Sequence, residues 1–323
     1  MDKVRKDMKD LKTTIRRVCN DNHVQEYVFE RSLDIVNMFK TVKELGYLNC
    51  DVEKKKTVLK YSEVDINAKD ENEKLIPLLA GMTFVSDEQL VATDYENRCI
   101  KLLNTNTYQL DCNFPVNSEP WDVTSTKVGH IAVTLPMKKR IQYLTVHNSS
   151  MSMGKDFQVN GECRGIDCKL GQLFVSYVSP GKVEILDMKG TVLKSFAGSN
   201  PETELFKWPG YISVITEPKQ WIYVSDKERD TVTRMTMDGQ IDQSFFGQNM
   251  KGPRGVAIDD NGFVFVCGRN SNTLCQILFK TKSVERLLER KDGLKQPHCL
   301  MWHNNRVYIS TCGGQFLRSW EVV

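Results

Sequence analysis

Four side chains that could bind an anion or a flat ligand stand at matching points of this sequence: Trp121, Arg164, Arg254 and His298. An arginine guanidinium donates from several N–H groups in one plane and can pair with both oxygens of a carboxylate or phosphate. A tryptophan indole stacks on a nucleic-acid base or fills a peptide pocket, and a histidine can transfer a proton near neutral pH. The residue types therefore indicate recognition of an anionic ligand, with His298 as a candidate base.

These four residues match because each directly precedes the anchor residue of a repeated unit. Consecutive anchors are separated by 41, 43, 46, 44 and 44 residues, and each is followed eight to eleven residues later by a second apolar strand. Six copies of a four-stranded unit at this period predict an all-β fold, a six-bladed β-propeller. The anchors are Gly81, Asp122, Gly165, Tyr211, Gly255 and Cys299, and the residues before them are Ala80, Trp121, Arg164, Gly210, Arg254 and His298.

The clearest unit covers residues 252–279. Pro253 leads into a short apolar strand, and Asp260-Asn261-Gly262 predicts a tight turn in which the glycine accepts a positive φ. Two further apolar strands follow, separated by the polar residues 269–272. In such a unit the pre-anchor residue enters the innermost strand at one mouth of the central channel, and the loop between the second and third strands opens on the same face.

That face is predicted to be rich in cations, whereas turns such as 86–88 and 259–261 make the opposite face more acidic. The candidate ligand-binding residues are Arg164, Arg254, Trp121, His298, Arg98, Lys138, Lys139, Arg140, Lys182, Arg229 and Arg269, and Lys227 lies in a loop predicted on the same face. The nearby acidic residues are Asp94, Glu96, Glu228 and Asp230. One interpretation is a recognition surface for a protein partner or a structured RNA, and the other is a solvated surface that keeps the protein soluble.

The amino-acid sequences of two repeats resemble those of a known family. Gly-Val-Ala-Ile-Asp at 255–259 and Leu-Val-Ala-Thr-Asp at 90–94, each within a two-strand unit, resemble the NHL repeat over residues 76–323. Together with a preceding helical segment, the chain resembles the C-terminal part of a tripartite-motif protein of the NHL subclass. The resemblance implies binding of protein or structured RNA on the basic face, and ubiquitin ligase activity where a RING domain is present. Only Cys19, Cys50 and His23 could serve a RING before residue 60, so a ligase module would lie outside this chain.

The N-terminal segment, residues 1–46, is predicted to be helical. Apolar residues spaced four and three apart give the seam of a coiled coil, which would make the protein a homodimer, and an amphipathic helix packed on its own propeller is the alternative. Residues 47–60 form a charged linker, and 61–323 form the propeller, in which 61–68 is expected to supply the outer strand of the last blade. The seam residues are Val4, Met8, Leu11, Ile15 and Val18.

Catalysis is a further alternative, because a calcium-dependent hydrolase or lyase can be built on such a propeller. Metal binding would need carboxylates at the channel mouth, and Asp122 and Asp167 are the nearest candidates. The sequence contains no His-Glu-x-x-His, no Gly-x-Ser-x-Gly and no phosphate-binding glycine loop. We therefore expect a non-catalytic scaffold without a metal or another cofactor.

Composition sets the remaining expectations. The 323 residues are 40% apolar with a net charge of +3, which is too small to require a nucleic-acid partner. The ten cysteines form no Cys-x-x-Cys pair, and no apolar run approaches membrane-spanning length. These features predict a cytoplasmic protein that does not enter a membrane.

Overall fold

The computed structural model describes residues 55–198, 204–313 and 316–323, with the backbone alone at 59–65. The chain divides into two compact units, Met1–Val52 and Glu53–Val323, and all described residues belong to the second. The predicted helical segment 1–46, including the seam residues Val4, Met8, Leu11, Ile15 and Val18, lies outside the described residues.

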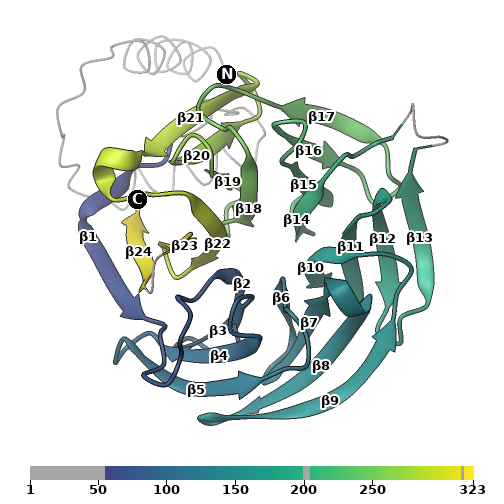
Figure 1. Cartoon of the computed structure of the whole chain (residues 1–323). Coiled ribbons are helices and arrows are strands. Elements are labelled where there is room, and N and C mark those ends of the chain that lie inside the picture. Colours follow the sequence, from purple (N-terminus) through teal and green to yellow (C-terminus); the bar gives the residue numbers. More distant parts are fainter. Residues whose placement is uncertain (1–54, 199–203, 314–315) are drawn as a thin grey trace, which may run out of the picture. The chain divides into compact units, whose positions relative to one another are not determined.

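Six four-stranded antiparallel sheets form a ring, as the repeats predict (Figure 1). Blade 1 contains β2 (Leu79–Phe84), β3 (Gln89–Asp94), β4 (Cys99–Asn104) and β5 (Gln109–Pro115). Blade 2 contains β6 (Val123–Lys127), β7 (His130–Leu135), β8 (Arg140–His147) and β9 (Ser150–Gln158). Blade 3 contains β10 (Cys163–Lys169), β11 (Gln172–Val178), β12 (Gly181–Asp187) and β13 (Val192–Ala197).

The other three blades repeat this order. Blade 4 contains β14 (Pro209–Ile215), β15 (Trp221–Asp226), β16 (Thr231–Met235) and β17 (Ile241–Phe245). Blade 5 contains β18 (Pro253–Ile258), β19 (Val264–Gly268), β20 (Thr273–Leu278) and β21 (Ser283–Leu288). Blade 6 contains β22 (Pro297–His303), β23 (Arg306–Thr311), β24 (Phe316–Val322) and β1 (Val58–Asn67). Two short 3-10 helices, η1 (Pro136–Lys138) and η3 (Arg290–Asp292), occupy loops.

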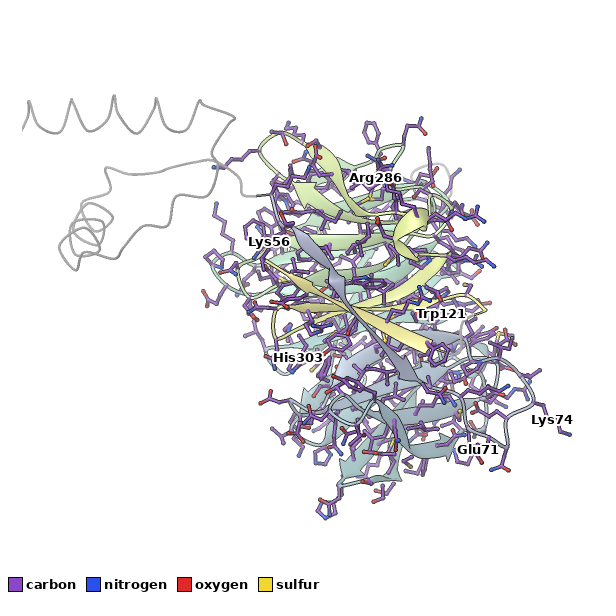
Figure 2. All side chains as sticks on the ribbon, turned by 90° about the vertical axis from the view of Figure 1, so that its left-hand side faces the viewer. Lys56, Glu71, Lys74, Trp121, Arg286 and His303 are labelled. Carbon is purple, nitrogen blue, oxygen red and sulfur yellow. The ribbon has the colours of Figure 1, made fainter. Side chains whose placement is uncertain are left out.

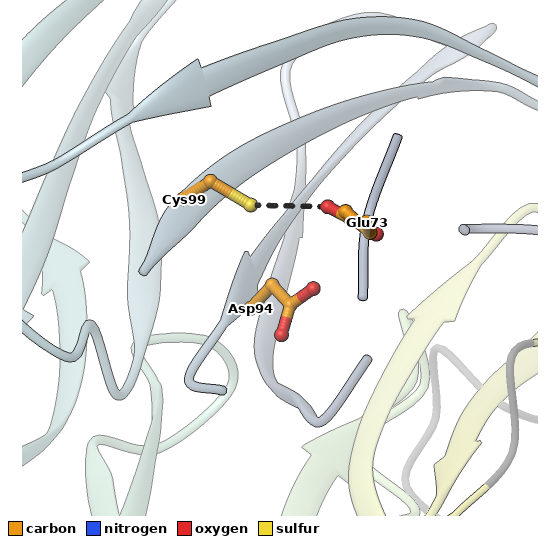
Figure 3. A group of neighbouring side chains, drawn as sticks. All are labelled: Glu73, Asp94 and Cys99. Carbon is orange, nitrogen blue, oxygen red and sulfur yellow. Dashed lines mark hydrogen bonds between the residues drawn. The ribbon is translucent and has the colours of Figure 1, made fainter. Parts of the chain in front are cut away.

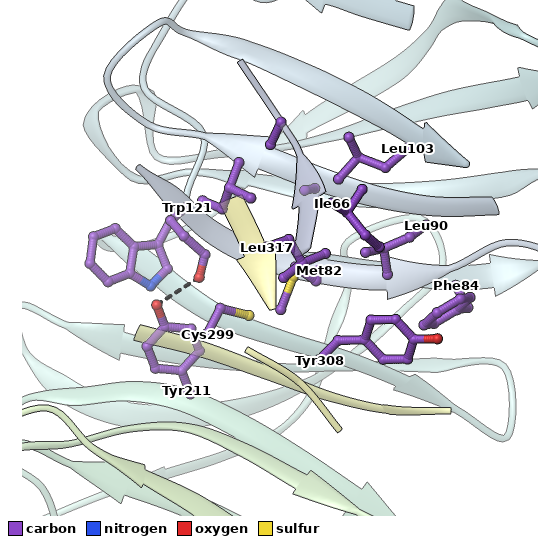
Figure 4. Packing of buried hydrophobic residues seen from close by; sticks show 14 residues of the cluster. Ile66, Met82, Phe84, Leu90, Leu103, Trp121, Tyr211, Cys299, Tyr308 and Leu317 are labelled. Carbon is purple, nitrogen blue, oxygen red and sulfur yellow. Dashed lines mark hydrogen bonds between the residues drawn. The ribbon is translucent and has the colours of Figure 1, made fainter. Parts of the chain in front are cut away.

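The last blade joins the two ends of the described chain. β1 pairs antiparallel with β24 and covers most of the segment 61–68. Two backbone hydrogen bonds extend this pairing between Thr57 and Val323, at 3.0 and 2.8 Å. Behind them, Ile66 and Leu317 pack with Leu90 and Tyr308 in one of six buried clusters, which reaches as far as Trp121 (Figure 4). This pairing closes the ring and removes an open sheet edge.

Close approach between neighbouring blades explains why only three of the six anchors are glycine. A Cβ on Gly165 would lie 2.7 Å from both the Cα of Tyr211 and the backbone nitrogen of Ile212. Gly81 approaches Asp122 in the same way, and Gly255 approaches the backbone of blade 6. Glycine therefore alternates with a larger anchor around the ring, because each glycine makes room for the anchor of the next blade.

Hydroxyl groups in the second strands also join neighbouring blades. Thr93 Oγ1 accepts the N–H of its own Gly81, at 2.8 Å, and donates to the Trp121 carbonyl of the next blade, at 2.7 Å. Thr134 forms the equivalent bond from blade 2 to blade 3, and Ser310 from blade 6 to blade 1. These bonds fix the inner strands, and therefore the residues at the channel mouths, relative to one another.

None of the helices in the described ranges has the length and apolar character needed to cross a membrane.

Candidate ligand-binding site at one channel mouth

The predicted mouth is formed where the first strands of the blades begin. Trp121 precedes β6, and Arg164, Arg254 and His298 lie near the starts of β10, β18 and β22. In the side view, Trp121 lies toward one face of the ring and His303, at the far end of β22, toward the other (Figure 2). The pre-anchor pattern therefore places these four residues on a common face.

Two indoles organise the site. The Arg164 guanidinium lies over the Trp121 ring, with its carbon 4.2 Å from the ring centroid, and is 5.4 Å from that of Trp208. Arg254 lies 4.7 Å from the Trp208 centroid and 6.0 Å from that of Trp121. The Lys227 ammonium is 4.2 Å from the Trp208 centroid. Both guanidiniums therefore rest against the same pair of indoles, which attract cations through their ring faces.

Arg254 is buried without a polar partner. It is 6% exposed, and its Nε and Nη1 are enclosed and make no hydrogen bond. No carboxylate in the described part of the chain lies within ion-pair distance of it, and the Nε atoms of Arg164 and Arg269 are also enclosed without a partner. A buried guanidinium that lacks hydrogen bonds is costly, because water solvated it in the unfolded chain.

The cations repel one another. Burial lowers the pKa of Arg254, and the charges of Arg269 and Arg164 lower it further. Burial likewise lowers the pKa of Lys227, as do Arg254, Arg164 and Arg269. We call Trp121, Trp208, Arg164, Arg254, Lys227 and Arg269 the cationic mouth. Since every charge in this set disfavours the others, an anion placed among them would be bound strongly.

His298 lies beneath this surface rather than on it. It is 3% exposed, and its Nδ1 is 2.8 Å from the hydroxyl of Tyr211, which donates to the Ala80 carbonyl at 2.7 Å. Burial and the neighbouring arginines hold the pKa of His298 well below its usual value. The sequence predicts His298 at the ligand-binding surface, whereas the structure buries it against Tyr211, where its lowered pKa keeps the ring uncharged near neutral pH.

Other predicted cations lie outside the cationic mouth. Arg98 pairs with Glu119 at 2.6 Å, Arg140 pairs with Asp156, and Arg229 lies 3.8 Å from Asp226 and donates to the Glu204 carbonyl. Lys138 and Lys139 are exposed at η1. Lys182 is buried and pairs with Glu184 at 2.5 Å, so it is not available as a surface cation. The structure therefore unites Arg164, Arg254, Arg269 and Trp121 and disperses the rest.

Trp208 belongs to the site although it is not one of the pre-anchor residues. Its indole folds back over Gly210, where a Cβ would collide with the ring. The signal was present in the sequence, because Gly210 occupies the pre-anchor position of blade 4 and leaves that space to Trp208. Tyr95, edge-on to Trp121 with centroids 5.8 Å apart, completes the aromatic group.

A second cluster resembles a metal site but is occupied by a lysine. Glu73, Asp94 and Cys99 lie close together (Figure 3). The buried Lys101 ammonium pairs with Glu73 and lies 3.5 Å from Asp94. Burial raises the pKa of the Cys99 thiol, which disfavours the thiolate that a metal needs. These contacts show a structural ion pair.

The channel widens toward the other face into a cavity of about 460 Å³, lined by all six first strands. Asp122 accepts the N–H of Ile166 from the next blade at 3.0 Å, and Asp167 accepts that of Val214 at 2.7 Å. Burial raises the pKa of Asp122 to about 8 and also raises that of Asp167. The two carboxyl groups therefore join blades and do not form a calcium cage.

The comparisons with known proteins support the fold. No protein-family model matches the sequence, and no curated protein matches it. Virginiamycin B lyase from Staphylococcus aureus is 14% identical over 79% of this chain and 82% of its own, with a TM-score of 0.56. A structure of the nidogen/laminin complex is 13% identical over 73% of this chain and 87% of its own, with a TM-score of 0.58. The Cps50 (Swd1) β-propeller domain of Myceliophteria thermophila is 12% identical over 76% of this chain and 83% of its own, with a TM-score of 0.56. At these identities the chain is similar to them as a β-propeller.

Proposed function

We propose that this protein is a non-catalytic scaffold whose cationic mouth binds an acidic segment of a partner protein. The observation that carries the proposal is Arg254, a buried guanidinium with two enclosed nitrogens and no hydrogen-bond partner. Arg164 beside it has one weak ion pair, to Glu162 at 3.7 Å. A ligand anion would supply the acceptors that the described residues do not, and this is how arginine clusters read acidic motifs.

Cationic side chains cover the two indoles, and this favours a protein ligand over an RNA ligand. A base can stack on tryptophan only where a ring face is open. Trp121 is 6% exposed and has Arg164 over its ring, while Lys227 and Arg254 approach Trp208. The tryptophans therefore support the arginines and offer little face to a base.

Binding rather than catalysis is proposed for a related reason. The candidate proton-transfer groups near the channel are His298, which is sealed, and Asp122 and Asp167, whose oxygens are bonded to backbone N–H groups. A general acid or base must reach the substrate. The similarity to a lyase is a similarity of fold and adds no catalytic argument.

The NHL resemblance of blades 1 and 5 supports an adaptor of the tripartite-motif type, with any ligase module outside this chain. The eight cysteines among the described residues are all free thiols, which supports a reducing compartment such as the cytoplasm.

The test is capture of partners by the full chain carrying Arg164→Gln with Arg254→Gln. The matched control carries Arg286→Gln with Lys194→Gln, which removes the same charge from residues that pair with Glu289 and Asp238. We expect the first double variant to lose partners by roughly a hundredfold, measured by quantitative mass spectrometry, because charge-assisted bonds are lost.

Ribonuclease treatment of the same samples should leave capture intact. Equal capture by both double variants would refute the proposed site. Capture that disappears with ribonuclease would reassign the mouth to RNA.

A further inference from the structure

The charge balance of the cationic mouth indicates how much negative charge its ligand should carry. Four cationic side chains, Arg164, Arg254, Arg269 and Lys227, interact electrostatically with one another. The carboxylates that act on this set are Glu162, 3.7 Å from Arg164, and Glu228, which acts on Lys227. The described part of the mouth therefore keeps an excess of two positive charges. One carboxylate from a ligand would neutralise half of that excess.

The geometry favours a group with several acceptor oxygens. Arg164 and Arg254 each lie near both indoles, with guanidinium carbons between 4.2 and 6.0 Å from the ring centroids. A guanidinium donates from N–H groups that lie in one plane, and three nitrogens of the two side chains have no acceptor in the described residues. A carboxylate has two oxygens, whereas a phosphate monoester has three and carries nearly two negative charges at neutral pH. One phosphate group could therefore accept from both arginines at once.

A nucleic-acid backbone fits less well. Each phosphodiester carries a single charge, and a strand needs a series of free cations along its path. Around the mouth, Arg98 pairs with Glu119 and Arg229 lies near Asp226. Arg164, Arg254 and Lys227, by contrast, are concentrated around the two indoles of the mouth.

From this concentration we infer that the cationic mouth is a receptor for a phosphorylated serine or threonine in the partner protein, bridged by Arg164 and Arg254. The inference rests on the proposed function and narrows it. Arg164 is the more exposed of the two arginines and would be reached first, and Arg254 beside it has no other acceptor.

The experiment measures binding of the full chain to three pools of short fluorescent peptides, by fluorescence anisotropy. The pools are degenerate in sequence and differ at one fixed central residue, which is phosphoserine, glutamate or serine. We expect the phosphoserine pool to bind roughly tenfold or more tightly than the glutamate pool, because a second charge and a third oxygen are added. The serine pool should bind more weakly still.

Variants locate the binding. Arg254→Gln should remove the preference for phosphoserine, and Arg286→Gln, whose side chain pairs with Glu289 at 2.8 Å, should keep it. If Arg254→Gln does not fold, Arg164→Gln and competition by inorganic phosphate on the unaltered chain give the same readout. A preference that survives both arginine substitutions, or that free phosphate does not reduce, would overturn the inference.

Two further outcomes separate this inference from the function on which it rests. Equal binding of the glutamate and phosphoserine pools overturns the phosphate assignment and leaves an acidic-peptide site. Phosphatase treatment of a lysate should remove the partners that depend on Arg164 and Arg254. Capture that depends on these arginines but resists phosphatase refutes the inference while the proposed function stands, and capture that ignores them refutes both.

Discussion

The two ends of the channel hold buried charge in opposite ways. At the cavity end, Asp122 gives its oxygens to the N–H groups of Val123 and Ile166, and burial raises its pKa to about 8. It can therefore lose its charge by keeping a proton at neutral pH. At the cationic mouth, Arg254 is equally buried but cannot release a proton under physiological conditions, because a guanidinium titrates far above neutral pH.

The difference shows how to separate structural from functional charge in this ring. A buried acid whose oxygens join two blades is part of the scaffold. A buried arginine with no acceptor lowers the stability of the free protein and is retained usefully only if a ligand provides the acceptor. Perturbed pKa values occur at both ends, so hydrogen-bond partners, rather than the pKa shifts, make the distinction.

The largest expected effect comes from the ring of anchors that separates the two ends. In Gly255→Ala the new Cβ would overlap the backbone of Leu300 in blade 6, so we expect a loss of about 3 kcal/mol in the free energy of unfolding. Gly171→Ala is the control, since no atom lies within 4 Å and only its φ of +68° matters, at about 1 kcal/mol. Urea unfolding measures both, and equal losses would contradict the close-approach explanation.

The next largest loss in the free energy of unfolding should come from removing the Asp122 carboxyl group at the cavity end. Asp122→Ala leaves two buried backbone N–H groups without acceptors and should lower the free energy of unfolding by about 2 kcal/mol. Asp87→Ala, at the exposed rim of the same cavity, should change it by less than about 0.5 kcal/mol. If Asp122→Ala is as stable as the Asp87 variant, the carboxyl group does not join the blades.

At the cationic mouth we expect a substitution to raise the free energy of unfolding rather than lower it. Arg254→Met keeps most of the side-chain volume and removes an unpartnered buried charge, so the ligand-free protein should gain about 1 kcal/mol. Ligand capture should be lost in the same variant. Thermal denaturation and capture are both measured, and a destabilised variant would show that Arg254 has a structural role.

The last effect is measured as a slope against pH rather than as a change in stability at one pH. The folded pKa of Asp122, about 8, lies above the unfolded value of about 4, so between these values the folded chain holds a proton that the unfolded chain has lost. The free energy of unfolding should therefore fall as pH rises through this window. Asp122→Asn should make the slope shallower in urea titrations from pH 5 to 8, and identical slopes would place the pKa of Asp122 near its usual value.

Much of the fold was predictable from the sequence because its repeats are local. The turn at Gly262 has the expected positive φ, +84°, and all six anchors lie in or directly before first strands. The reason that glycine alternates with Asp122, Tyr211 and Cys299 was not predictable, because it depends on how close neighbouring blades come.

The site was predictable in position but not in composition. A pre-anchor position fixes where Trp121, Arg164 and Arg254 enter the ring, and these three meet. It does not fix side-chain direction or pairing, so the burial of His298 beside Tyr211 and the pairing of Lys182 with Glu184 were missed. The first depends on a contact between residues 87 positions apart, and the second on the side chains of Lys182 and Glu184 meeting on one face of β12.

The pairing of β1 with β24 also bears on how the protein is made. β1 is translated before any other described strand, and its partner, Phe316–Val322, follows all the other described strands. Until then blade 6 lacks its two outer strands, and only contacts between inner strands, such as the Ser310–Leu79 hydrogen bond, join it to blade 1. Arg164 and Arg254 come from separate blades, so a nascent chain should acquire affinity for its ligand only when synthesis reaches this final strand.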